Sequence, residues 1–349
     1  MGRRLLLLGC ALALHVDAQR LEVVSQDAKP VLSVRHPDAR GNRFGFEGGR
    51  VVKVGGAYHL FTSEMVSLPI WAKMRLGHWT SRDGRGWKRV GTLYESSGDC
   101  TGADPRGALW SPIPVFDELE RRWNLFYVAY RCKPNTKEQF LSNHDGEIWR
   151  AVSQKDGEAG IGGPYKDVGV VMRRGPDSLS WEGLQGTDSF FPYRVGDRWY
   201  AMYGSARTEK LPIEHWLVGL ATAPSVGGPW RRVREHSPLG IERRFIENPM
   251  VSSLPGGGYL CVYDSEAADS IGYAVSKDGV KWGAGRALRI QAWAGDVRTP
   301  LGLVSERGNE YTVFYTGFED RPDWDAFLAN RPGTARCSIG RVRVRVLPE

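Results

Sequence analysis

WNLFYVAY, residues 123–130, is a strand-length run of aromatic and apolar residues, and comparable runs recur along the chain. The others are YHLFTS (58–63), WYAMYGS (199–205), YLCVYDS (259–265) and YTVFYTG (311–317). Each run follows a strand that opens on a polar residue and precedes another short strand, at 76–84, 148–157, 218–225, 271–279 and 339–346. Five such repeats predict an all-β chain folded as a five-bladed β-propeller, with four-stranded antiparallel blades around a central channel.

The composition agrees with many short strands joined by turns. The 349 residues include 43 Gly and 20 Pro, which punctuate turns, and 13 Trp and 13 Tyr, which favour strands. The repeats cover nearly the whole chain, so we expect a single propeller domain at 19–349.

Residues 1–18 have the features of a secretory signal. Arg3 and Arg4 supply positive charge, residues 5–14 are apolar, and 16–18 end in a small residue suited to cleavage. The apolar run is too short to span a bilayer. We therefore expect a secreted or periplasmic protein that begins at Gln19 and has no membrane span. Lipidation of Cys10 is the alternative, which the short apolar run before it disfavours.

The formal net charge of +7 leaves two interpretations of the partner. The charge indicates either a basic surface with no functional role or a protein that binds an acidic polysaccharide. The basic residues are scattered and no nucleic-acid-binding module is present, so we expect no nucleic-acid partner. We expect an oligo- or polysaccharide substrate and a monomeric protein.

Four cysteines follow the leader, and none has metal-ligand spacing. Cys261 lies in an apolar strand and is expected to be a buried thiol. Cys100 precedes the second blade and Cys132 follows its second strand, so a hairpin could bring them to one rim. An exported protein permits a disulfide between them, and free thiols are the alternative.

Closure of the ring depends on where the fourth strands lie. Candidates follow the first four repeats, at 88–94, 166–172, 231–235 and 285–290. The fifth repeat has none after it, and the segment PVLSVRH (30–36) could supply one from the N-terminal side. That pairing would remove an exposed strand edge. Two turns, SRDGRGW (81–87) and SKDGVKW (276–282), resemble the Asp-box of sialidases but are expected to be purely structural.

The residues that open the first strand of each blade indicate chemistry. They are Glu47 in FEGGRVV (46–52), Trp110 and Ser111 in LWSPIPV (109–115), Asp188 in GTDSFFPY (186–193), Glu247 in IENPMVS (246–252) and Arg298 in VRTPLGL (297–303). Carboxylates confined together raise the pKa of at least one of them, which suits a general acid at neutral pH. Each also has a structural alternative: Asp188 and Glu247 could serve turns, Glu47 could pair with an Arg, and Arg298 could be the partner of any of these carboxylates without contacting a ligand.

At these positions the chain resembles the five-bladed propeller glycoside hydrolases of family 43 and its relatives in families 62, 32 and 117. The resemblance implies that Glu247 is the general acid, that Asp188 tunes its pKa and orients the sugar, and that Glu47 activates water. Glu47 stands where the family has Asp, and Ile113 stands where a Trp-Ala-Pro-Asp element would have its Asp. The expected reaction is hydrolysis of a glycosidic bond, with inversion carried over from the resemblance.

Other residues complete the expected site. Arg298 is expected to contact the substrate, together with Trp110, Ser111, Phe190 and His215; Trp71, Trp181, Phe191 and Trp293 are further candidates for stacking on sugar rings. No cofactor is required, although some relatives hold a channel calcium ion through a His and waters. Because Glu47 stands where the family has Asp, a non-catalytic carbohydrate-binding propeller remains an alternative. A phosphorylase or lyase on the same scaffold is another.

Overall fold

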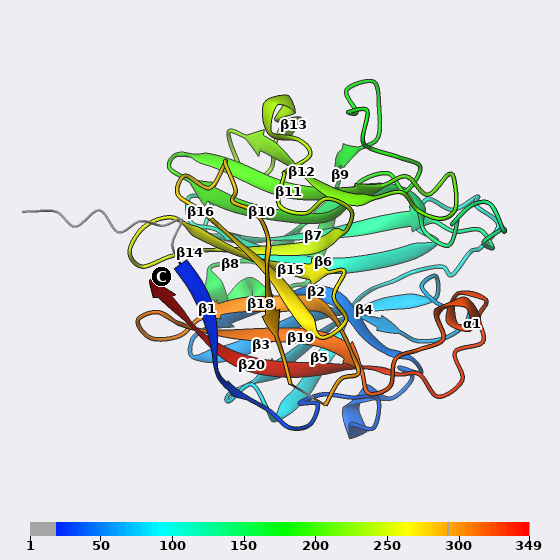
Figure 1. Cartoon of the computed structure of the whole chain (residues 1–349), viewed down its shortest axis with the longest axis horizontal. Coiled ribbons are helices and arrows are strands. Elements are labelled where there is room, and N and C mark those ends of the chain that lie inside the picture. Colours follow the sequence, from blue (N-terminus) through cyan, green and yellow to red (C-terminus); the bar gives the residue numbers. More distant parts are fainter. Residues whose placement is uncertain (1–18, 292, 349) are drawn as a thin grey trace, which may run out of the picture.

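Strands account for most of the computed structural model, which describes residues 19–348 except residue 292 (Figure 1). The predicted leader, its cleavage site and Cys10 lie outside the described residues. Within residues 19–348, no helix is both long and apolar enough to cross a membrane. The helical elements are short: α1 (Trp324–Leu328) and the 3-10 turns η2 (Pro37–Ala39), η3 (Glu158–Gly162) and η4 (Arg234–His236).

The strands pair in antiparallel groups of four, of which three are separate sheets and two are joined in one eight-stranded sheet. The first four units are β2 (Gly45–Val54), β3 (Ala57–Met65), β4 (Met74–Ser81), β5 (Trp87–Glu95); β6 (Ala108–Asp117), β7 (Arg122–Arg131), β8 (His144–Asp156), β9 (Tyr165–Arg173); β10 (Asp188–Val195), β11 (Arg198–Ala206), β12 (Trp216–Ala223), β13 (Arg231–Arg232); and β14 (Ile246–Ser253), β15 (Tyr259–Ser265), β16 (Ser270–Ser276), β17 (Arg286–Arg289). The expected all-β class is therefore confirmed, and the predicted fourth strands pair where expected, although β13 is only two residues long.

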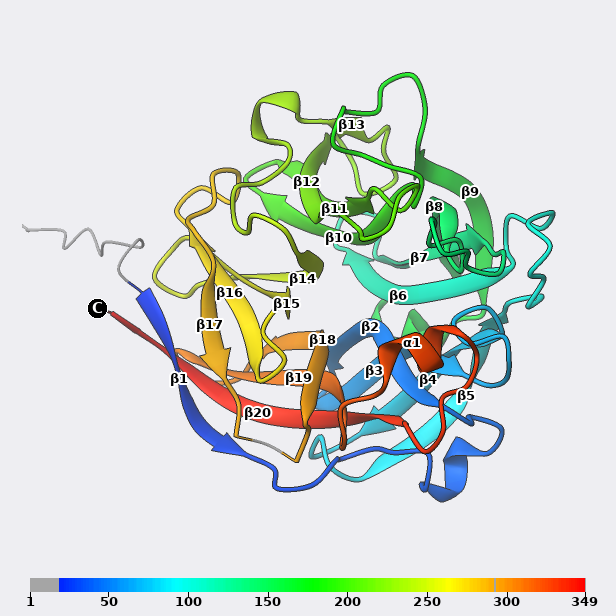
Figure 2. The ribbon, with the colours of Figure 1, turned by 45° about the vertical axis from the view of Figure 1, so that its right-hand side comes forward.

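The fifth unit takes its fourth strand from the N-terminal side, but not from the predicted segment. It consists of β18 (Asp296–Ser305), β19 (Glu310–Phe318), β20 (Cys337–Pro348) and β1 (Gln19–Gln26). β1 runs antiparallel to β20, with Leu21 opposite Val346 (Figure 2). The expectation that residues 30–36 form this strand is wrong. That segment begins with a proline, which cannot donate to a ladder, and makes a single bridge, Leu32 to Ile339.

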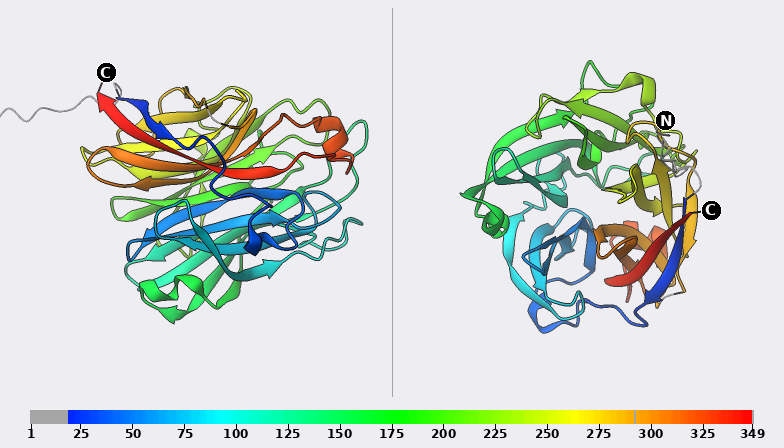
Figure 3. Two further views of the ribbon diagram at one scale, coloured as in Figure 1. Left: turned by 90° about the horizontal axis from the view of Figure 1, so that it is seen from below. Right: turned by 90° about the vertical axis from the view of Figure 1, so that its left-hand side faces the viewer.

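The first strands of the five units meet at the centre of the molecule. β2 contacts β6, β6 contacts β10, β10 contacts β14, β14 contacts β18, and β18 contacts β2. The fifth unit joins the first through a parallel pairing of Gly45 with Cys337. Seen from the side of Figure 3, right, the sheets surround this common centre. Residues from distant parts of the sequence therefore converge there.

The second strands explain the aromatic repeats. β7 is buried along nearly its whole length because neighbouring strands flank it and neighbouring units cover both faces. A strand covered on both sides is a nearly continuous apolar run rather than an alternating one. Aromatic side chains fill the space between units, as where Phe126 of β7 meets Phe190 of β10 with ring centroids 5.2 Å apart.

The two Ser-x-Asp-Gly turns are structural, as expected. In the first, the Ser81 hydroxyl accepts a hydrogen bond from the amide of Gly84 at 2.9 Å, and Asp83 accepts two more from the following backbone. In the second, Ser276 and Asp278 make the corresponding bonds. Both turns connect third to fourth strands.

Candidate active site

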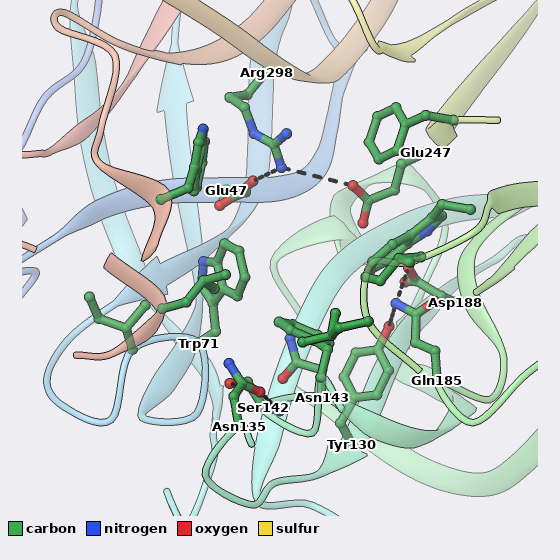
Figure 4. Close-up of a pocket in the computed structure, with 18 of the residues that line it drawn as sticks. Glu47, Trp71, Tyr130, Asn135, Ser142, Asn143, Gln185, Asp188, Glu247 and Arg298 are labelled. Atoms are coloured by element: carbon green, nitrogen blue, oxygen red, sulfur yellow. Dashed lines mark hydrogen bonds and ion pairs between the residues drawn. The ribbon is translucent and has the colours of Figure 1, made fainter. Parts of the chain in front are cut away.

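A cavity of about 1120 Å³ opens at the start of the first strands (Figure 4). Seven of the predicted site residues line it: Glu47, Trp110, Ser111, Asp188, His215, Glu247 and Arg298. Phe190 does not. Its ring is buried in the core, 5.1 Å from the ring of Trp230, so its position does not agree with the expectation that it contacts a substrate. Among the other aromatic candidates, Trp71 lines the cavity as well.

A bulge in each first strand turns the opening residue toward the cavity. Pairing with the second strand shifts register directly after Glu47, Trp110, Asp188 and Glu247, and in the fifth strand directly before Arg298. In four strands the next residue has a left-handed backbone, with φ of 63° at Gly48, 48° at Ser111, 52° at Ser189 and 49° at Asn248. An extra residue of this kind bends a strand and redirects a side chain. This irregularity, repeated in all five strands, brings their opening residues to one place.

Arg298 joins the carboxylates across the cavity. One terminal nitrogen, Nη2, donates to Glu47 Oε1 at 3.1 Å and lies 3.9 Å from Glu247 Oε2. The other, Nη1, lies 3.3 Å from Asp264 Oδ2. Only 18% of the Arg298 side chain is exposed, so these ion pairs are shielded from water. The guanidinium, carried by β18, thereby contacts carboxylates from three other strands, β2, β14 and β15.

Glu47 has one oxygen engaged and one free. Its Oε1 accepts from Arg298, whereas its Oε2 is buried and has no hydrogen-bond partner among the described residues. A buried, unpaired carboxylate oxygen is costly unless something else fills its place. Glu47 lines the cavity, so a shift of its side chain would bring this oxygen to a water molecule or a substrate hydroxyl there. In that position the oxygen can accept a proton from water.

Glu247 is the carboxyl best suited to carry a proton. Burial raises its pKa well above the ordinary value, and the nearby Asp188 raises it further. Asp264 and Glu47 act in the same direction, while Arg298 opposes them. A carboxyl that stays protonated near neutral pH can act as a general acid.

Asp188 is held by three donors. The amide of Ser189 donates at 2.5 Å and Nε2 of Gln185 at 3.2 Å. The hydroxyl of Tyr130 also bonds to it. These bonds lower the pKa of Asp188, but burial is the larger effect and leaves the pKa raised. Sequence reasoning missed Gln185 and Tyr130, since neither opens a strand.

Asp264 is a further carboxylate that the sequence analysis did not select. It lies on β15 directly opposite Glu247, and burial raises its pKa to about 7. Arg298 opposes that rise, whereas Glu47 and Asp296 add to it. The sequence does contain a signal for it, because Asp264 is an acidic residue in the apolar run YLCVYDS. Antiparallel pairing places the end of this run beside the start of the preceding strand, where Glu247 lies.

One wall of the cavity is aromatic. The ring of Trp71 contacts those of Trp110, Phe140 and Trp324, with centroids 6.0 to 6.3 Å apart. Trp71 has φ of 65°, an uncommon conformation for a bulky residue, and its carbonyl accepts from Trp110 Nε1 at 3.1 Å. Asn135, Ser142 and Asn143 line the cavity beside this wall (Figure 4). Flat apolar faces beside polar groups suit sugar rings.

The residues present do not fit a channel calcium ion held by a histidine. His215 is the histidine that lines the cavity, and its Nε2 lies 3.0 Å from the carbonyl oxygen of Trp181. Within the described part of the chain, no group of three or more His, Cys, Asp or Glu side chains could hold a metal ion. No step of a mechanism is therefore assigned to calcium.

Cys100 and Cys132 reach the same wall of the cavity, but the expected disulfide is not formed. Both are free thiols. The two thiols are neighbours. Burial raises the pKa of the Cys132 thiol, and a hydrogen bond with Cys100 raises it further. Cys261 is a buried thiol, as expected.

Comparison with known proteins rests on structure. No protein-family model and no curated protein sequence matches the chain. Solved structures do match. The chain has the fold of the β-propeller glycoside hydrolases. Zg3597, a family 117 glycoside hydrolase of the marine bacterium Zobellia galactanivorans, is 13% identical with a TM-score of 0.63, over 95% of this chain and 91% of that one.

Two further structures support the same conclusion. The GH43_1 enzyme of Xanthomonas citri, solved with xylotriose, is 15% identical over 93% of this chain and 89% of that one, with a TM-score of 0.55. The GH32 β-fructofuranosidase BmSUC1 of Bombyx mori is 13% identical over 90% of this chain and 62% of that one, with a TM-score of 0.55. The resemblance to families 43, 32 and 117 is thus confirmed at the level of the fold.

Proposed function

We propose that the five units are the blades of one five-bladed propeller, and that the protein hydrolyses glycosidic bonds in its central cavity. The observation that carries this proposal is the pair Glu47 and Glu247. They come from two different first strands, face one open cavity and are bridged by a single nitrogen of Arg298. Glu47 has an oxygen without a hydrogen-bond partner, which suits a base, and Glu247 has a strongly raised pKa, which suits an acid.

In the proposed reaction, Glu247 donates its proton to the glycosidic oxygen as the bond to the anomeric carbon breaks. Oε2 of Glu47 takes a proton from the water whose oxygen forms the new bond to that carbon. Asp188 keeps Glu247 protonated until substrate is bound. Arg298 orients Glu47 and balances the charge of the surrounding carboxylates.

The distances through Arg298 limit the gap between acid and base. Since Nη2 lies 3.1 Å from one oxygen and 3.9 Å from the other, Glu47 Oε1 and Glu247 Oε2 are at most about 7 Å apart. Inverting enzymes use ~6.5–9.5 Å between carboxyls and retaining enzymes ~5–5.5 Å. We propose inversion, in keeping with the resemblance to family 43, and the anomeric configuration of the first product, followed by proton NMR, tests it.

The charge of the cavity favours hydrolysis of a neutral sugar. Among the described Lys and Arg residues that line it, Arg298 is the only one that is not exposed, and Glu47 and Asp264 already engage it. A phosphate nucleophile, or a uronate at the reacting position, would need a further buried cation. Lys133, Lys137, Arg244 and Arg321 lie exposed around the rim, where an acidic polymer could meet them. We further propose export after cleavage at residue 18 and a monomeric protein.

A substrate screen tests the proposed function. The parent protein and a Glu47→Gln/Glu247→Gln double variant are incubated with a panel of neutral and acidic oligo- and polysaccharides, and new reducing ends are measured. We expect the parent to release sugar from at least one neutral glycan and the double variant to bind that glycan without cleaving it. Binding without turnover by both proteins would favour a carbohydrate-binding propeller, and turnover only with phosphate a phosphorylase.

A further inference from the structure

Asn248 connects the inner strands beneath the carboxylates. Its side-chain Oδ1 accepts a hydrogen bond from the hydroxyl of Ser111 on β6 at 3.3 Å, and its Nδ2 donates to Thr299 on β18 at 3.4 Å. Its backbone amide donates to the hydroxyl of Ser189 on β10 at 3.2 Å. Asn248 itself follows Glu247 on β14. One residue therefore joins four of the five first strands.

The fifth first strand meets the same cluster by close packing. A Cβ atom on Gly48 of β2 would lie 2.4 Å from the Ser111 hydroxyl oxygen, so a larger residue there would displace that hydroxyl. Gly48, Ser111, Ser189, Asn248 and Thr299, one residue from each first strand, thus converge below the carboxylates. Ser111 and Asn248 form part of the cavity lining, and all four side chains of the set are buried.

Asparagine suits this position for two reasons. Its φ of 49° lies in the left-handed region, which asparagine tolerates better than most residues. Its amide presents an acceptor and a donor together, which two hydroxyls on opposite sides can satisfy. Pro249 follows in the bulge, where no ladder hydrogen bond is needed, so the backbone under Glu247 has few alternatives.

We propose that Asn248 is a positioning residue that fixes Glu247 against Asp188 and Arg298 by tying β14 to β6, β10 and β18. The inference deepens the proposed function, because Glu247 is its general acid. The charged and titratable groups that act on Glu247 come from five strands: Glu47 on β2, Tyr130 on β7, Asp188 on β10, Asp264 on β15 and Arg298 on β18. Loss of the tie lets the carboxyl move toward water and away from Asp188.

The test uses Asn248→Gly, which keeps the left-handed backbone and removes the side-chain bonds. We expect kcat to fall about 10- to 100-fold with KM nearly unchanged, because a small displacement of a catalytic group costs rate rather than binding. We also expect the basic limb of the kcat/KM profile to move to lower pH, since the general acid would lose its proton sooner. Thr299→Val, which removes one partner, should give a smaller change in the same direction and serves if the glycine variant does not fold.

The matched control is Arg121→Gly, an exposed turn residue with φ of 49° that lies outside the cavity. It should change neither kcat nor the pH profile. A merely structural role for Asn248 predicts a lower Tm with an unmoved basic limb, and that result would overturn the proposal.

A second measurement is independent of turnover. The protonated carboxyl of Glu247 is titrated by infrared difference spectroscopy, with Glu247→Gln variants to assign its band, in the parent and in Asn248→Gly. We expect the band to disappear at lower pH in the glycine variant. An identical midpoint in both would overturn the positioning role. A shifted midpoint in a protein that cleaves no glycoside would retain this role and remove the proposed function instead.

Discussion

Asp264 lies 3.3 Å from Arg298 and directly opposite Glu247 in the ladder of β14 and β15. Asp264 pairs with one terminal nitrogen of the guanidinium, Nη1, and the other, Nη2, lies near Glu47 and Glu247. One buried cation is thus shared by several carboxylates, and it cannot neutralise all of them. Burial is the largest cause of the raised pKa values of Glu247 and Asp264, and the neighbouring carboxylates raise both further while Arg298 opposes them.

The raised pKa of Asp264 makes a prediction for stability. Folding shifts this pKa from an ordinary 3.8 to about 7, so between these values the folded protein holds a proton that the unfolded chain has released. Stability from this group is fully present below pH 4 and is lost as the pH rises through 7. Asp264→Asn should flatten the fall in Tm between pH 4 and 7.

Thermal melting at a series of pH values measures this effect. Asp145→Asn, at an exposed position, is the matched control and should keep the parent slope. If the Asp264→Asn variant loses Tm with pH as steeply as the parent, Asp264 is ionised in the folded protein and the charge arrangement given above is wrong.

Glu247→Gln keeps the shape of the proposed acid but cannot donate a proton. General acid–base groups contribute ~10²–10⁴-fold in rate, so the variant should lose about that much on substrates with poor leaving groups. Activated aryl glycosides, whose leaving groups need little protonation, should lose far less. Steady-state rates on a matched pair of substrates measure the difference, and equal losses on both would contradict the acid role.

Glu47→Gln should impair both kinds of substrate alike, because each needs an activated water. We expect a loss of ~10²–10⁴-fold in kcat, with binding retained, since the amide oxygen can still accept from Arg298. Glu306→Gln is the control: that residue pairs with Lys53 outside the cavity and should leave activity unchanged. Parent-level hydrolysis of an aryl glycoside by Glu47→Gln would show that another group activates the water.

The fold and the opening residues could be predicted from the sequence because both depend on local patterns. The aromatic runs recur at regular intervals, and a charged residue before an apolar strand is visible without coordinates. What the sequence does not show is the bulge after each opening residue. In a regular strand Asp188 and Phe190 would lie on one face, and Trp110 and Ser111 on opposite faces. The register shifts break this alternation, so Phe190 enters the core while Trp110 and Ser111 both reach the cavity.

The remaining parts of the site depend on contacts between distant segments. Gln185 is identified only by its bond to Asp188, and Asp264 by its place opposite Glu247. The sequence also does not show which segment supplies the fourth strand of the fifth unit, because β1 and residues 30–36 are both compatible with a short strand. Only the packing of Leu21 and Val23 along β20 distinguishes them. Sequence patterns give the elements, whereas pairing across units selects among them.

The role proposed for Asp188 predicts the direction of a pH shift. Its negative charge is the second cause, after burial, of the raised pKa of Glu247. Asp188→Asn removes that charge and should lower the pKa of Glu247. A general acid must be protonated to act, so the basic limb of the kcat/KM profile should move to lower pH. Gln185→Ala removes one donor to Asp188 but keeps its carboxyl, so its basic limb should move less than that of Asp188→Asn. Profiles measured on one substrate for the parent and both variants test this, and a basic limb that moves to higher pH in Asp188→Asn would mean that Asp188 does not act on Glu247 through its charge.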